Sequence, residues 1–206
     1  MVKLFCERID DIEVSDHLKS LSKDRLSRIE EITDETAKKQ AVGAELLLNK
    51  AVKAVCPNME TPVDYERDEF GKPYFKDGSL YFSISHSGSF AAVCVSDMPV
   101  GVDIEEKREY KAGLARRFFS IHEAVDVTLH PDRQHRFLSY WVMKESYMKK
   151  DGRGFHMGMK SFTVFPDGSV LKNNKKDENA KFTLFRVNDY YLCVCSDPAA
   201  GTVERV

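Results

Sequence analysis

The spacing of apolar residues in the first half of the chain predicts a strand and two helices. The segment from Val2 to Ile9 is predicted as a short first strand. Helical spacing follows Ser15, a possible helix cap, at Leu18, Leu21, Leu26 and Ile29. A second helical run extends from about Asp34 to Val55, and Pro57 ends it.

The rest of the chain repeats this order of helices and then strands. Residues 57–79 are rich in Pro, Gly and Asp and are predicted as loops. Strands are predicted at Leu80–Ser85, Phe90–Ser96 and Val100–Glu105, helices at about 111–129 and 133–150, and strands again at 161–165, 181–187 and 190–196. This order favours an α+β fold with antiparallel sheets over a doubly wound parallel fold.

Composition narrows the class of protein. With 206 residues, 31% charged and 42% apolar, the chain is typical of a soluble globular protein. A net charge of -2 gives no support to nucleic-acid binding. The five cysteines include no C-x-x-C pair, so we expect no disulfide framework or zinc site and a reducing, cytoplasmic setting. The charged N-terminus and the lack of a long apolar run predict neither a signal peptide nor a membrane span.

Two segments about forty residues apart carry the main candidate chemistry. Gly101-Val102-Asp103-Ile104-Glu105 reads as a strand, on which Asp103 and Glu105 point the same way because strand side chains alternate. In the helix that follows, Trp141, Glu145 and Lys149 are spaced at i, i+4 and i+8 and share one face. Three carboxylates beside an ammonium group suit Mg²⁺ and a pyrophosphate substrate. Trp141 itself, on an apolar stripe with Phe137, is predicted as a core residue.

Two upstream motifs offer phosphate contacts. Ser85-His86-Ser87 lies at a predicted strand-to-turn junction, where hydroxyl and backbone N–H groups are anion donors. Lys72 lies in a loop shaped by Gly71 and Pro73.

With these motifs in view, the chain resembles the Sfp-type 4′-phosphopantetheinyl transferases. The resemblance covers roughly residues 70–155 and rests on five elements in the family's order and spacing: Gly71-Lys72-Pro73-Tyr74, Ser85-His86-Ser87, Gly101–Glu105, Phe118–Glu123 and Trp141–Gly154. It implies transfer of 4′-phosphopantetheine from coenzyme A to a serine of an apo acyl or peptidyl carrier protein, with Mg²⁺.

The resemblance also implies an architecture. We expect a pseudo-dimer of two similar halves, 1–99 and 100–206, each with helices packed on a small antiparallel sheet, and a site in the cleft between them. A built-in pseudo-dimer makes a monomer sufficient, and we expect one.

Residue roles follow by resemblance. Asp103 and Glu105 would bind the metal, and Glu145 would be a third ligand or the base that takes the serine proton. Lys149, Lys72, Ser85 and His86 would contact coenzyme A phosphates, and Lys149 would assist catalysis. Lys39, four residues before Gly43, falls where the family often has an Arg for the 3′-phosphate. The remaining assignments are a supporting role for Lys144, a metal-supporting or helix-capping role for Glu123, and release of the chain from the helix by Gly152 and Gly154.

Plainer interpretations compete with these roles. Asp103 and Glu105 also fit a solvated strand end, Glu145 and Lys149 an ordinary helix pair, and Lys39 a solvated helix lysine. An alternative of another class is a coenzyme A or carrier-protein binding module without transferase activity. Mg²⁺-dependent hydrolysis of a nucleotide pyrophosphate is also compatible with the acidic residues. Because carriers are usually acidic, Arg116, Arg117, Lys150 and Arg153 are candidate docking residues.

Overall fold

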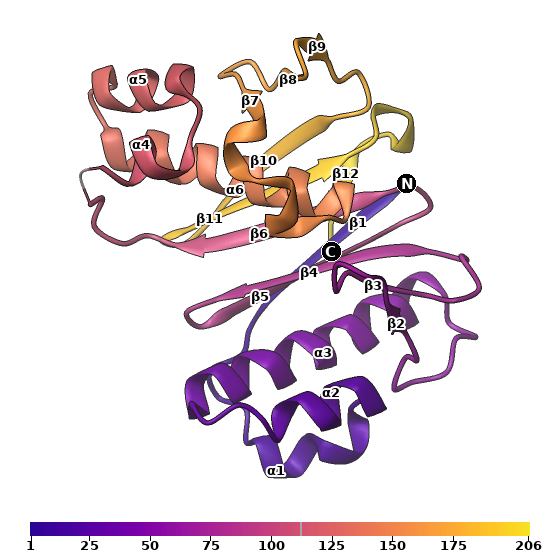
Figure 1. Cartoon of the computed structure of the whole chain (residues 1–206). Helices are drawn as coiled ribbons and strands as arrows, with labels where there is room; N and C mark the ends of the chain where they lie inside the picture. The colour runs from indigo at the N-terminus through magenta and orange to yellow at the C-terminus, as the bar shows by residue number, and fades with distance from the viewer. Residues whose placement is uncertain (112) are drawn as a thin grey trace.

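Two sheets lie face to face, and each carries a long helix on its outer side (Figure 1). The computed structural model describes residues 1–111 and 113–206; Ala112, inside the helix predicted over 111–129, lies outside the described residues. The predicted α+β class is confirmed. Among the described residues no helix is long and apolar enough to cross a membrane.

The first sheet has the order β12-β1-β5-β4 and the second β10-β11-β6. Their strands are β1 Val2–Arg8, β4 Tyr81–Ser87, β5 Phe90–Ser96, β6 Val100–Glu106, β10 Lys181–Val187, β11 Tyr190–Ser196 and β12 Val203–Arg205. Neighbours pair antiparallel, except that β12 runs parallel to β1. Because β12 returns to the first sheet, the division at residue 99 stays a prediction.

Two helices match their predicted bounds to within one residue, whereas the other two predicted helices are each divided into shorter ones. They are α1 Val14–His17, α2 Lys23–Ile29, α3 Glu35–Val55, α4 Leu114–Phe118, α5 Ile121–Leu129 and α6 Arg133–Asp151. Ser15 caps nothing; Ser22 caps α2 by accepting from the Arg25 N–H. The helix predicted over 111–129 is likewise divided at Ser120, which caps α5. The apolar spacing continues through the caps at Ser22 and Ser120. The sequence pattern therefore predicted one helix where the structure has two or more.

Short elements complete the chain. They are β2 Glu66–Arg67, β3 Pro73–Tyr74, β7 Phe162–Val164, β8 Val170–Lys172, β9 Lys175–Lys176 and the 3₁₀ turns Leu18–Ser20, Gly154–Met157, Met159–Ser161 and Pro198–Ala200. The predicted strand at 161–165 corresponds to β7, whereas β2, β3, β8, β9 and β12 were not predicted.

Three apolar clusters hold the layers together. One lies between the sheets and joins Leu4 and Ala92 of the first to Val102 and Leu192 of the second. The other two lie between each sheet and its helix, α3 or α6. Apolar side chains on both faces of each sheet explain why β5 and β11 are apolar along their length.

A seam of serines joins strand β4 of the first sheet to strand β6 of the second. Ser83, Ser85 and Ser87 alternate along β4, and each hydroxyl oxygen accepts a backbone N–H of β6, at 3.0, 3.3 and 3.1 Å. These N–H groups belong to Val102, Ile104 and Glu106, on the outer edge of the second sheet. The seam satisfies edge donors that β11 cannot reach and aligns β4 with β6.

Helix α6 lies directly on β6 at Gly101. A Cβ atom there would lie 2.0 Å from the Ser146 carbonyl oxygen and 2.5 Å from the Lys150 nitrogen. The absence of a side chain therefore permits backbone contact between helix and strand. This contact brings the helix face of Glu145 and Lys149 over the strand face of Asp103 and Glu105.

Candidate active site

A cavity of about 550 Å³ opens where the two sheets meet. Both parts of the chain line it: α2, the Phe70–Pro73 loop and β4 on one side, and β6, α6 and the turn after α6 on the other. Of the residues predicted for the site, it brings together Lys72, Ser85, His86, Asp103, Glu105, Glu145 and Lys149.

Asp103 is the innermost carboxylate. Its Oδ1 accepts from Ser85 Oγ at 2.8 Å and forms an ion pair with Lys149 Nζ at 2.7 Å. Its Oδ2 is buried and has no hydrogen-bond partner among the described residues. Burial raises the pKa of Asp103, and the Lys149 charge opposes that shift. The free oxygen can accept a further cation or proton.

Glu105 lies on the same face of β6, as predicted, but is held by donors. Trp141 Nε1 donates to Oε1 at 3.1 Å, while Arg108 and Ser87 approach Oε2 at 2.8 and 3.3 Å. Trp141 is thus both a core residue, packed against Phe118, and a part of the cavity wall.

Glu145 is buried close to both other carboxylates. Burial, followed by the negative charges of Asp103 and Glu105, raises its pKa to about 7, although Lys149 opposes this. No described residue donates a hydrogen bond to it. A carboxyl group with a pKa near neutral pH is suited to exchange a proton.

In the centre of the cavity, Lys149 supplies an ammonium group and His86 supplies an imidazole ring. Lys149 Nζ bonds to Ser85 Oγ at 2.8 Å as well as to Asp103, so the Ser85 hydroxyl is already occupied within the protein. His86 is part of β4 rather than a turn, because that strand continues to Ser87. Desolvation, Lys149 and Arg25 lower the pKa of His86 to about 4. At pH 7 its ring is neutral.

Comparison with known proteins identifies the family to which the chain belongs. A family model described as "4′-phosphopantetheinyl transferase superfamily" matches residues 99–195, and "4′-phosphopantetheinyl transferase, N-terminal" matches residues 11–98. A 4′-phosphopantetheinyl transferase of Bacillus subtilis is 35% identical over 169 residues, which cover 79% of this chain and 75% of the relative. The chain belongs to the 4′-phosphopantetheinyl transferase family.

Other relatives agree with this assignment. The 4′-phosphopantetheinyl transferase gsp of Aneurinibacillus migulanus is 31% identical, with 74% of this chain and 66% of the relative covered. Several other curated relatives are matched over about half their length. The solved holo-[acyl-carrier-protein] synthase of Thermotoga maritima aligns with this chain at a TM-score of 0.40 and 16% sequence identity. The alignment covers 48% of this chain and 61% of the synthase chain. The predicted family and its two-half α+β organisation are confirmed.

Three arginines that the sequence patterns did not indicate line this transferase cavity. Arg25 and Arg28 come from α2, and Arg67 from β2. Glu45 of α3, with 0% exposure, accepts from Arg25 Nε at 3.2 Å, the Ser22 N–H at 2.8 Å and Tyr65 Oη at 2.7 Å. Glu45 therefore fixes the start of α2 and the direction of Arg25. The spacing Ser22-x-x-Arg25-x-x-Arg28 was the available signal, but it is common on solvated helices.

Lys72 bridges the two parts of the chain. Its Nζ donates to the Lys150 carbonyl oxygen at 3.0 Å, and desolvation lowers the pKa of Lys72. Gly152 ends α6 at φ +100°, and a Cβ there would lie 3.3 Å from Lys72 Cδ. The predicted role of Gly152 in ending the helix is confirmed.

Three predicted residues lie away from the cavity lining. Lys39 pairs with Glu13 at 3.5 Å and is not among the lining residues, which include Arg25 and Arg28 instead. Lys144 is fully buried and pairs with Glu123 at 2.6 Å. Glu123 also forms a capping box with Ser120, so helix capping is its observed role. Lys144 lies about 100° around the helix from Glu145, which directs it into the core instead of the site.

The carboxylates partly match the needs of Mg²⁺. Within residues 1–111 and 113–206 no group of three acidic, His or Cys side chains is placed to hold a metal by itself. Mg²⁺, however, is usually bound by one or two carboxylates, water and substrate phosphates. The unpartnered Oδ2 of Asp103, beside Glu145, fits this incomplete protein shell.

Proposed function

We propose that this chain transfers the 4′-phosphopantetheine group of coenzyme A to a serine hydroxyl of an apo carrier protein, with Mg²⁺ as cofactor. The observation that carries the proposal is a single cavity in which three carboxylates meet the cations Arg25, Arg28, Arg67, Lys72 and Lys149. Carboxylates suit a hard metal, and the cations suit the phosphates of coenzyme A. This combination has no evident use in a plain binding module.

The protein's own groups position the phosphates. Glu45 directs Arg25, and the Lys150 carbonyl directs Lys72. Both cations supply fixed charges on the side of the cavity formed by α2 and the Phe70–Pro73 loop. Lys149 reaches from α6 toward the reacting centre, and the neutral His86 offers a ring nitrogen. Mg²⁺ held by Asp103, with Glu105 close by, would offset charge on the pyrophosphate oxygens. Catalysis is then mainly positioning and charge stabilisation.

Glu145 takes the proton in this proposal. The serine oxygen forms a bond to the phosphorus that carries pantetheine, the bond to 3′,5′-adenosine bisphosphate breaks, and the serine proton passes to the Glu145 carboxylate directly or through water. The raised pKa of Glu145 and its lack of a hydrogen-bond donor among the described residues support this role over that of a fixed ligand.

The surroundings suit a carrier protein as the acceptor. Arg116 and Arg117 are exposed on α4, whereas Arg153 already pairs with Asp151 at 2.6 Å. We therefore place the docking of an acidic carrier at Arg116 and Arg117. The cavity is completed within one chain, which supports a monomer, and the five cysteines, all free, suit a reducing cytoplasm.

The defining experiment is incubation with coenzyme A, Mg²⁺ and a set of apo carrier proteins. A carrier serine should gain ~340 Da, the mass of the phosphopantetheine group. Acyl and peptidyl carriers are both included because each offers a serine hydroxyl as the acceptor. Binding of coenzyme A without a mass gain on any carrier would leave the binding-module alternative, and release of a cleaved nucleotide without carrier would indicate a hydrolase.

A stability measurement tests the strain among the carboxylates. Without Mg²⁺ and coenzyme A, we expect Glu145→Gln to stabilise the fold at pH 8 by up to about 3 kcal/mol. Because the pKa of Glu145 rises from 4.5 to about 7 in the folded state, folding binds a proton between these values. The part of the folding stability that is linked to Glu145 is fully present below pH 4.5 and is lost as the pH rises to about 7.

Urea unfolding across pH 5–8 measures this effect. The stability of the parent protein should fall with increasing pH more steeply than that of Glu145→Gln, and Mg²⁺ should reduce the difference at pH 8. The exposed Glu35→Gln in α3 is the control. Equal pH slopes for the parent and Glu145→Gln would contradict the proposed repulsion.

Glu45→Gln tests whether the direction of Arg25 matters for coenzyme A. Loss of the charged partner should weaken the hold on Arg25 and raise the KM for coenzyme A about tenfold, with kcat within about twofold, because Glu45 lies behind the wall. Initial rates at varied coenzyme A and saturating carrier measure both constants, with Glu35→Gln as control. A fall in kcat at unchanged KM would assign Glu45 another role.

A further inference from the structure

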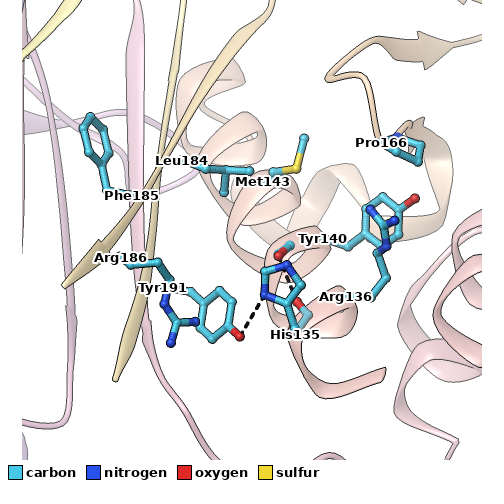
Figure 2. Close-up of a pocket in the computed structure, with 10 residues that line it drawn as sticks. His135, Arg136, Tyr140, Met143, Pro166, Leu184, Phe185, Arg186 and Tyr191 are labelled. Atoms are coloured by element: carbon cyan, nitrogen blue, oxygen red, sulfur yellow. Dashed lines mark hydrogen bonds between the residues drawn. The ribbon is translucent and has the colours of Figure 1, made fainter. Parts of the chain in front are cut away.

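A second cavity lies on the opposite side of α6. It measures about 210 Å³ and shares no lining residue with the active-site cavity. Residues at the start of α6, on β10 and β11 and in the turn after β7 enclose it (Figure 2). Tyr140, Met143 and Tyr191 are buried and form its base, while Leu184 at its rim is 48% exposed.

The charges around this cavity leave one guanidinium without a partner. Arg136 is neutralised by Asp126, whose Oδ2 lies 3.1 Å from its Nε, and Asp126 also accepts from Tyr140. Arg186 lies over the Tyr191 ring, with its Cζ 3.6 Å from the ring centroid. No carboxylate among the described residues lies within ion-pair distance of Arg186. Arg186 is exposed, so the mouth of the cavity carries one guanidinium without an ion-pair partner among the described residues.

His135 adds a neutral donor. Its Nδ1 lies 3.1 Å from the Tyr191 hydroxyl oxygen. A dashed line marks this contact in Figure 2. Desolvation and the charges of Arg186, Arg136 and His130 lower the pKa of His135, against the opposing effect of Asp132. The ring is therefore mostly neutral at pH 7, and when Tyr191 donates to Nδ1 the ring proton resides on Nε2.

We propose that this cavity is a binding site for a small aromatic monocarboxylate. The single uncompensated charge at Arg186 matches one carboxylate, for which a guanidinium is the best side-chain partner. Tyr140, Met143, Leu184 and Pro166 supply apolar contacts for a flat ring. A cavity of about 150 Å³ can hold benzene, so this one accommodates one ring with a short acidic substituent. The site does not depend on the transferase reaction.

NMR titration of the full chain with phenylacetate tests the proposal. We expect saturable amide shifts at the start of α6 and along β10 and β11, which persist with saturating coenzyme A. Phenylacetamide, which has the same ring and no charge, should bind at least tenfold more weakly. Arg186→Gln should weaken phenylacetate binding at least tenfold. Arg133→Gln, at the start of α6 and outside the cavity, should leave the binding unchanged.

Each alternative result counts against the site. Non-saturable shifts, equal binding of the amide, or unchanged affinity in Arg186→Gln would overturn the proposal. So would shifts that map to β6 and disappear with coenzyme A, since they would report occupancy of the other cavity. Thermal unfolding of both variants verifies that a loss of binding is not a loss of fold.

Discussion

Asp103→Asn is expected to lower the rate of phosphopantetheine transfer by about 10³-fold or more. The substitution keeps the size of the side chain but removes the charge that pairs with Lys149 and the free carboxylate oxygen available to Mg²⁺. Electrostatic groups at a reacting centre commonly contribute effects of about this size. Because Asp103 is buried, its environment has little water to replace the lost charge.

The rate of mass gain on an apo carrier, at varied Mg²⁺ and coenzyme A, measures this loss. Excess Mg²⁺ should not restore the rate if Asp103, as proposed, positions the metal and pairs with Lys149 in addition to providing metal affinity. Asp97→Asn, an exposed residue paired with the N-terminus, is the matched control. If the Asp103→Asn variant transfers phosphopantetheine at a rate within tenfold of the parent, the proposed role of Asp103 in metal binding is wrong.

Lys144→Met is expected to cost about 3–5 kcal/mol of folding stability, the usual effect of breaking a buried ion pair. Lys144 and Glu123 are each 0% exposed in their side chains, and Lys144 also donates to the Phe162 carbonyl at 2.9 Å. Methionine fills most of the volume but leaves the Glu123 charge buried without its ammonium partner. Two backbone N–H groups, of Val164 and Ser120, remain on Glu123 and limit the loss.

Urea unfolding measures the cost, with the exposed Lys175→Met as control. The double variant Lys144→Met with Glu123→Gln should be more stable than Lys144→Met alone, because it removes the unpaired charge. A loss below about 1 kcal/mol in the single variant would contradict the stabilising role of the Lys144–Glu123 ion pair. The transfer rate below the unfolding transition separates this structural role from catalysis.

Local periodicity was enough to predict which polar side chains share a face of β6 or of α6. Alternation along β6 placed Asp103 and Glu105 together, and the i, i+4 spacing placed Glu145 and Lys149 opposite them. The same reasoning separated Lys144 from Glu145 by about 100°. These predictions hold because they need only the geometry of one strand and one helix.

Long-range placement could not be predicted in this way. Arg25 enters the cavity because Glu45 and Tyr65 hold the start of α2, a contact between residues far apart in sequence. Lys39 is one helix away and turns toward Glu13. Some local signals were nevertheless available: Ser120-x-x-Glu123 is a capping-box pattern that marks where α5 begins.

The serine seam makes different demands on the side chains of the two strands that it joins. β6 contributes three main-chain N–H groups to the joint, a group that every amino acid except proline has. In addition, Ser85 and Ser87 donate to the side chains of Asp103 and Glu105. The main-chain part of the joint is therefore independent of the β6 side chains, while β4 must keep a hydroxyl at every second position. In a redesign of the acidic site, Asp103 and Glu105 are the positions of β6 to vary, whereas Gly101 and the serines of β4 should be kept.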